Sequence, residues 1–111
     1  MPNFTIEEME GTMRGIVNYE LGEPPRDCIS NLSDYGFTKE MMRFFGVPRE
    51  YFDDPVKKPR KAHPFKAEEL DVVLSNVVEY ELEEPEEYYL DTLYDMGYSS
   101  AMLEHYGAYR D

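Results

Sequence analysis

The residues most able to do chemistry in this chain are carboxylates, and they are densest between residues 79 and 91. Clustered carboxylates steer and hold a basic partner, and tyrosines among them add amphipathic contact area. The stretch therefore predicts a partner-binding surface. The expected contact residues are Glu79, Glu81, Glu83, Glu84, Glu86, Glu87, Tyr88 and Asp91.

A structural interpretation of the same stretch stays open. Several of these carboxylates lie near the expected start of a helix, where the helix dipole favours negative charge. A well-capped and solvated helix end would explain them without any partner. The two interpretations differ in whether the carboxylates contact another molecule.

The other groups that could act in catalysis are few. His63 lies in a proline-rich segment. His105 belongs to a segment that repeats an earlier part of the chain (described below), in which Phe44 stands at the equivalent position. Cys28 lies on an apolar helical face, as a core thiol does. No Ser-His-Asp or Cys-His arrangement can be recognised, so we expect no catalytic residue and no enzyme activity.

Carboxylates also bind metals, but the spacings of the common carboxylate sites are missing. Neither the D-x-[DN]-x-[DN]-G calcium loop nor the E-x-x-H spacing of di-iron bundles occurs. The single cysteine excludes an intramolecular disulfide and a cysteine-based zinc cluster. There is also no glycine-rich phosphate loop. We therefore expect no metal and no cofactor.

The acidic stretch belongs to the second copy of an internal repeat. Residues 3–48 (the first repeat) and 64–109 (the second repeat) align without a gap at an offset of 61, and 14 of 46 positions are identical. A unit of this size buries little apolar surface alone, so we expect both copies to share one domain. The identical pairs are Phe4/Phe65, Glu7/Glu68, Glu8/Glu69, Val17/Val78, Tyr19/Tyr80, Glu20/Glu81, Leu21/Leu82, Glu23/Glu84, Pro24/Pro85, Leu32/Leu93, Asp34/Asp95, Gly36/Gly97, Met41/Met102 and Gly46/Gly107.

Each repeat predicts three helices. Thr5 and Glu8 form a T-x-x-E capping box before a run of apolar residues at helical spacing. Pro24 suits the first turn of a second helix, and Gly36 suits its left-handed end. Thr38 can cap a short third helix. The expected fold is all-α, with six helices as two pseudo-symmetric three-helix repeats from an internal duplication.

Residues 49–63, between the repeats, read as a basic, proline-containing linker. Tyr51 and Phe52 leave open whether part of it packs onto the helices. Its basic run, residues 57–61, lies beside a strongly acidic second repeat in the sequence. We therefore expect the run to contact that repeat within the molecule.

The formal net charge is −13, and its distribution is uneven. The first repeat carries −4 and the linker +2, whereas the second repeat carries −11, with 12 acidic residues and one basic residue. Such a chain repels nucleic acid and anionic membranes and attracts basic protein surfaces. Neither a long apolar run nor a secretory signal is present, so we expect a cytoplasmic protein that does not cross a membrane.

These features predict a small acidic, non-enzymatic binding protein that occupies a basic surface of a larger protein. Nucleic-acid-handling enzymes offer such surfaces, and an acidic chain can compete there with the phosphate backbone. In size and acidity the chain resembles phage-encoded nucleic-acid mimics that inhibit restriction enzymes and CRISPR nucleases. The alternative is a self-associating structural or regulatory helical module, for instance a homodimer formed through exposed aromatic residues, with no nucleic-acid link.

Overall fold

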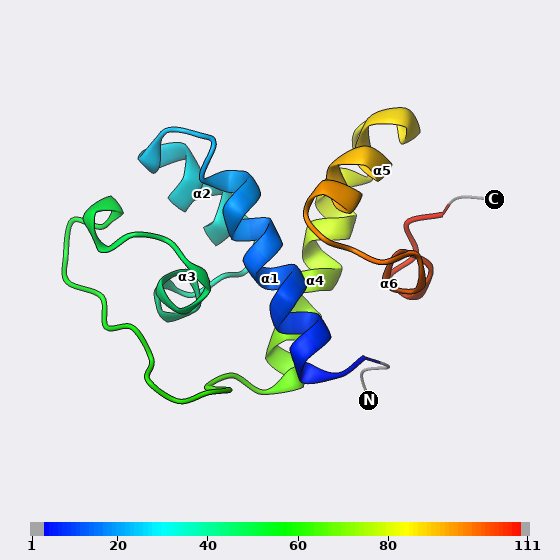
Figure 1. The fold of residues 1–111 in the computed structure, drawn as a ribbon. Helices are drawn as coiled ribbons and strands as arrows, with labels where there is room; N and C mark the ends of the chain where they lie inside the picture. Colours follow the sequence, from blue (N-terminus) through cyan, green and yellow to red (C-terminus); the bar gives the residue numbers. More distant parts are fainter. Residues whose placement is uncertain (1–3, 110–111) are drawn as a thin grey trace.

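The computed structural model describes residues 4–109. This range contains six α-helices and one short 3-10 helix, joined by turns and loops (Figure 1). Residue 86 is described there by its backbone alone. No strand occurs within this range, so the predicted all-α fold with six helices is confirmed. None of these helices has the length and apolar character needed to cross a membrane. The helices are α1 (Ile6–Glu20), α2 (Pro25–Tyr35), α3 (Lys39–Phe45), η1 (Arg49–Tyr51), α4 (Ala67–Glu81), α5 (Glu86–Asp95) and α6 (Ser100–His105).

Side chains cap several helix starts in the predicted way. Thr5 accepts a hydrogen bond from the backbone N–H of Glu8, and the Glu8 carboxylate accepts one from the backbone N–H of Thr5. This reciprocal pair satisfies two N–H groups that have no partner inside α1. Thr38 and Ser99 cap α3 and α6 by accepting from the N–H three residues further on.

The turns at both ends of α2 and α5 follow from proline and glycine. The sequence predicts Pro24 in the first turn of its helix, but Pro24 and Pro85 both have an extended backbone and act as N-caps. α2 and α5 therefore begin one residue later, at residues 25 and 86. Gly36 and Gly97 have φ values of 102° and 101°. Glycine adopts this left-handed conformation without the steric cost of a Cβ. The chain can therefore turn sharply into the next helix at both positions.

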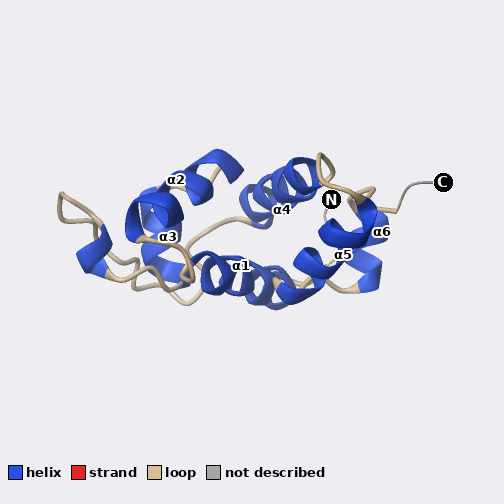
Figure 2. Ribbon diagram, turned by 90° about the horizontal axis from the view of Figure 1, so that it is seen from above, coloured by secondary structure: helices blue, strands red, loops and turns tan. Residues whose placement is uncertain are grey.

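The two long helices α1 and α4 cross at the centre of the molecule, with α2 and α3 on one side and α5 and α6 on the other (Figure 1). The molecule is a flat slab of 45 × 30 × 17 Å, as seen from above in Figure 2. Buried side chains of both long helices belong to one continuous apolar cluster, because each helix carries an apolar stripe at helical spacing. The stripes include Met9, Met13, Ile16, Leu70, Leu74 and Val77.

Aromatic residues just before the long helices reach across to the other repeat. Phe4 lies edge-on to His105 of α6, with 5.4 Å between ring centroids. Phe65 lies edge-on to Phe44 of α3, with 5.8 Å between centroids. These two contacts occupy equivalent positions at the offset of 61, so each repeat supplies one ring to the third helix of the other.

A second pair of equivalent contacts joins each long helix to the other repeat. The backbone carbonyl of Met96 lies so close to Gly15 of α1 that a Cβ at Gly15 would collide with it. In the matching place, Asn76 of α4 donates a hydrogen bond of 3.1 Å to the carbonyl of Tyr35. Each long helix therefore approaches the end of the second helix of the other repeat. α1 does so through the backbone at Gly15, and α4 does so through the amide side chain of Asn76.

Candidate partner-binding surface

The predicted contact residues lie on one continuous stretch that runs from the end of α4 through a turn into α5. Most of their side chains are exposed, as a contact surface requires. Two differ: the side chain of Glu86 lies outside the described part of the chain, and Glu81 is half-buried. The exposed members are Glu79, Glu83, Glu84, Glu87, Tyr88 and Asp91.

The start of α5 carries an acidic hollow with an apolar floor. Glu87 and Asp91 are one helical turn apart, and with Pro85 and Leu90 they line a surface hollow of about 580 Å³. A lysine or arginine side chain combines an aliphatic stem with a cationic head. The hollow offers a matching apolar area beside two carboxylates, so it can hold such a side chain by packing and by charge-assisted hydrogen bonds.

A second acidic group forms where α4 ends. Glu79 and Glu83 line a hollow of about 340 Å³ together with Tyr80, Asn76 and Asp34. Asp34 comes from α2 of the first repeat, so the acidic surface extends across both repeats. Sequence reasoning missed Asp34, because its proximity to Glu79 arises only from the packing of α2 on α4.

Glu81 faces the interior of the molecule. Burial raises the pKa of its carboxyl, and the charges of Glu84 and Glu20 raise it further. Glu20, the equivalent residue of the first repeat, is buried and accepts hydrogen bonds from Asn31 at 2.8 Å and Tyr35 at 3.4 Å. Burial also raises the pKa of Glu20, although these two hydrogen bonds oppose the shift. Glu81 is therefore less available to a partner than the exposed carboxylates around it.

Exposed tyrosines border the acidic surface. Tyr88 is 61% exposed on α5, and Tyr94 and Tyr109 are also exposed. The hydroxyl groups of Tyr94 and Tyr109 are 2.8 Å apart, and the Tyr94 hydroxyl is 3.2 Å from that of Ser100. The bond between the two tyrosines holds Tyr109 against Tyr94 of α5. Sequence reasoning named only Tyr88, because Tyr94 and Tyr109 become neighbours only through the path of the chain across α6.

Comparison with known proteins does not assign this surface. No family model matches the chain, and neither curated proteins nor solved structures give a significant match. The internal comparison between repeats is more informative, because exposed carboxylates of the second repeat replace neutral or basic residues of the first. Glu79, Glu83, Glu87 and Asp91 stand where the first repeat has Asn18, Gly22, Arg26 and Ser30.

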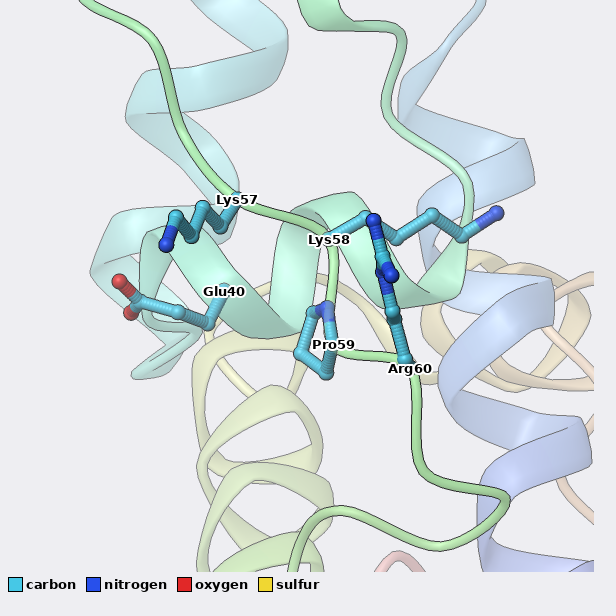
Figure 3. A pocket seen from close by; sticks show the side chains of 5 residues that line it. All are labelled: Glu40, Lys57, Lys58, Pro59 and Arg60. Carbon is cyan, nitrogen blue, oxygen red and sulfur yellow. The ribbon is translucent and has the colours of Figure 1, made fainter.

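The basic run of the linker lies against the first repeat, at the end of the slab opposite α5 and α6 (Figures 1 and 2). Lys57, Lys58, Pro59 and Arg60 line a hollow of about 830 Å³ with Glu40 of α3. Figure 3 shows Lys57 and Glu40 extending to the same side of the hollow and Lys58 to the opposite side. Within residues 4–109, the three cations form no ion pair. The predicted contact between this run and the second repeat is therefore wrong.

Anchors at both ends of the linker explain its position. Arg43 of α3 donates hydrogen bonds to the carbonyls of Val47 and Val56, at 3.0 and 3.3 Å. At the other end, Nδ1 of His63 lies 2.9 Å from the buried Glu10 carboxylate of α1. Both anchors belong to the first repeat, so they hold the basic run away from the acidic surface.

The remaining candidate groups are Cys28 and His105. Cys28 is fully buried, and burial together with the nearby Glu20 charge raises the pKa of its thiol to about 11. A thiol with this pKa is almost entirely protonated at neutral pH and is a poor nucleophile. His105 is exposed on α6 and makes edge-on contacts with the rings of Phe4 and Tyr106. Over residues 4–109, no three His, Cys, Asp or Glu side chains converge as metal ligands would.

Proposed function

We propose that this protein is a small acidic, non-enzymatic binding protein whose α4–α5 surface occupies a basic surface of a larger protein. The observation that carries the proposal is the difference in charge between two repeats whose buried apolar positions nearly all correspond. Because the first repeat folds on this pattern without the added carboxylates, folding alone does not account for them. Binding to a basic partner does account for them.

The partner class that we favour is a nucleic-acid-handling enzyme, such as a host defence nuclease inhibited by a phage-type mimic. The exposed carboxylates gather in two groups, with Glu79 and Glu83 at the end of α4 and Glu87 and Asp91 at the start of α5. A protein that presents such groups can displace the phosphate backbone from a basic groove, with a strong dependence on salt. Such an encounter would take place in the cytoplasm, and the protein itself would not bind nucleic acid.

We further propose that the fold arose by duplication of one three-helix unit, so that 3–48 and 64–109 are its copies and 49–63 is the connecting linker in one shared domain. The matching helix starts support this: α1, α2 and α3 begin at residues 6, 25 and 39, and α4, α5 and α6 begin at residues 67, 86 and 100. The reciprocal contacts of Phe4 and Phe65 support it as well. The two copies then differ in surface charge, with −4 in the first and −11 in the second.

The test of the binding function is capture from a cell lysate at low salt, with elution by a salt step and identification by mass spectrometry. The proposal predicts that a basic, nucleic-acid-binding enzyme elutes with the salt. It is contradicted if no such protein elutes at any salt concentration, because a surface of this charge then has no partner to hold.

Self-association is the second candidate, and the exposed apolar side chains favour it. Tyr88 and Val72 are 61% and 57% exposed, and further tyrosines lie near the acidic surface. An apolar contact between two copies would bury them. Size-exclusion chromatography at two salt concentrations separates the candidates, because an apolar dimer persists in high salt whereas a complex through the acidic face weakens.

A further inference from the structure

The first repeat shows what covers the equivalent face of α2. The chain that follows α3 returns over this helix, so that α2 and η1 are in contact. A hollow of about 460 Å³ lies between them, with Pro25 and Ile29 on the α2 side and Tyr51 and Phe52 on the other. Both aromatic residues pack against the core. An apolar helix face is thus partly covered by an aromatic pair from the linker.

The charges around this contact are complementary. Arg26 and Lys39 lie on the helical side of the hollow, whereas Glu50, Asp53 and Asp54 belong to the covering segment. The segment therefore carries carboxylates on both sides of its aromatic pair, opposite a basic helical face. Apolar side chains and side chains of opposite charge thus line the same hollow.

The second repeat has the same apolar position with the opposite charge. Leu90 replaces Ile29 at the floor, Glu87 replaces Arg26, and Asp91 replaces Ser30. Among residues 4–109, the hollow over Leu90 is lined by Pro85 and by residues of α5, and no segment that follows α5 in this range lines it. Within residues 4–109, the two hollows thus differ in the sign of the rim charge and in whether a linker segment lines them.

We propose that the hollow over Pro85 and Leu90 binds a partner segment in which an aromatic side chain is flanked by lysine or arginine residues. The segment lies on α5 as Tyr51 and Phe52 lie on α2, and its basic residues face Glu87 and Asp91. This inference rests on the proposed function and names the chemistry of the partner. The acidic surface attracts the partner, and the apolar floor selects an aromatic residue.

A second copy of this chain is a poorer occupant. Its own aromatic segment carries Glu50, Asp53 and Asp54, which would face the carboxylates Glu87 and Asp91. Like charges in contact oppose binding, so the occupant requires the reverse charge.

The experiment uses three fluorescently labelled peptides of residues 48–54 and the full chain, with binding followed by fluorescence anisotropy near physiological salt. The first peptide carries Glu50→Lys, Asp53→Lys and Asp54→Lys. The second peptide adds Tyr51→Ala and Phe52→Ala, and the third is unchanged. We expect the first to bind about tenfold more tightly than the second, because the aromatic pair buries apolar area, and the third not to bind.

Two protein variants locate the site. Leu90→Ser removes the apolar floor and should reduce the advantage of the aromatic peptide to less than about twofold, with circular dichroism showing that the helices persist. Glu87→Lys combined with Asp91→Lys should abolish binding of both basic peptides. The control is Glu68→Lys combined with Glu104→Lys, which changes the net charge of the second repeat equally at exposed sites on α4 and α6.

The outcomes separate this inference from the proposed function. If both basic peptides bind equally, or if Leu90→Ser leaves the aromatic advantage intact, the hollow is not a docking site and only a general acidic attraction remains. Tight binding of the unchanged peptide would assign the hollow to a second copy and overturn the inference. Failure of every peptide to bind also overturns it, whereas the proposed function is judged by the lysate capture.

Discussion

The ring of Phe4 lies edge-on to the ring of His105, at the opposite end of the chain, with 5.4 Å between their centroids. Phe65 makes the equivalent contact with Phe44, at 5.8 Å. Each repeat thus completes the apolar surroundings of the other. These contacts join the segment before each long helix to the third helix of the other repeat, on the two sides of the α1–α4 crossing.

Truncating either ring should loosen this exchange. Phe4→Ala and Phe65→Ala should each lower the free energy of unfolding by about 1–3 kcal/mol, below the cost for a fully buried ring because both are half-buried. Urea denaturation measures the change, and Phe4→Leu and Phe65→Leu serve as controls that keep most of the apolar area. If neither alanine variant lowers the free energy of unfolding by more than the experimental error, the two contacts contribute nothing to stability.

Two glycines of α1 should respond in opposite directions to the same substitution. Gly15→Ala places a methyl group against the carbonyl of Met96, so we expect the free energy of unfolding to fall by about 1–3 kcal/mol. Gly11→Ala meets open space within the same helix and should raise it by about 0.5–1 kcal/mol. Thermal unfolding of both variants checks the pair. Equal effects would show that α1 does not approach the turn after α5 this closely.

Stability should increase as the pH falls from neutral toward 5. Burial raises the carboxyl pKa of Glu20 and Glu81 above the ordinary value of 4.5. The folded state therefore binds these protons more tightly than the unfolded chain does, and the stabilisation is lost as the pH rises through the raised values. The melting temperature measured across this range should rise with acid, and Glu20→Gln should flatten the profile. The exposed-site control Glu104→Gln should keep the slope, and an unchanged slope in Glu20→Gln would contradict this origin.

Sequence reasoning predicted the features that depend on neighbouring residues. The capping box of Thr5, the cap at Thr38 and the left-handed Gly36 each follow from interactions within a few residues, which a single sequence displays. The repeat then extended the same expectations to the second half of the chain. Helix number and order could therefore be predicted.

The features that depend on tertiary packing could not be predicted. Asp34 joins Glu79 beside the α4 end because α2 packs on α4, and no spacing in the sequence shows this. Glu81 looks like its exposed neighbours in the sequence but faces Glu20 in the structure. Opposite charge in the sequence predicts a contact between the basic run and the second repeat, yet hydrogen bonds of Arg43 and His63 hold the linker on the first repeat.

The most direct measurement is a side-by-side capture from lysate at low salt with the native chain and a charge-reversed variant. The variant carries Glu79→Lys, Glu83→Lys, Glu87→Lys and Asp91→Lys, all at exposed positions, so circular dichroism and the melting temperature should show that it remains folded. We predict that the native chain retains a basic partner that the variant releases completely. Equal retention of that partner by the folded variant would contradict binding through the acidic α4–α5 surface.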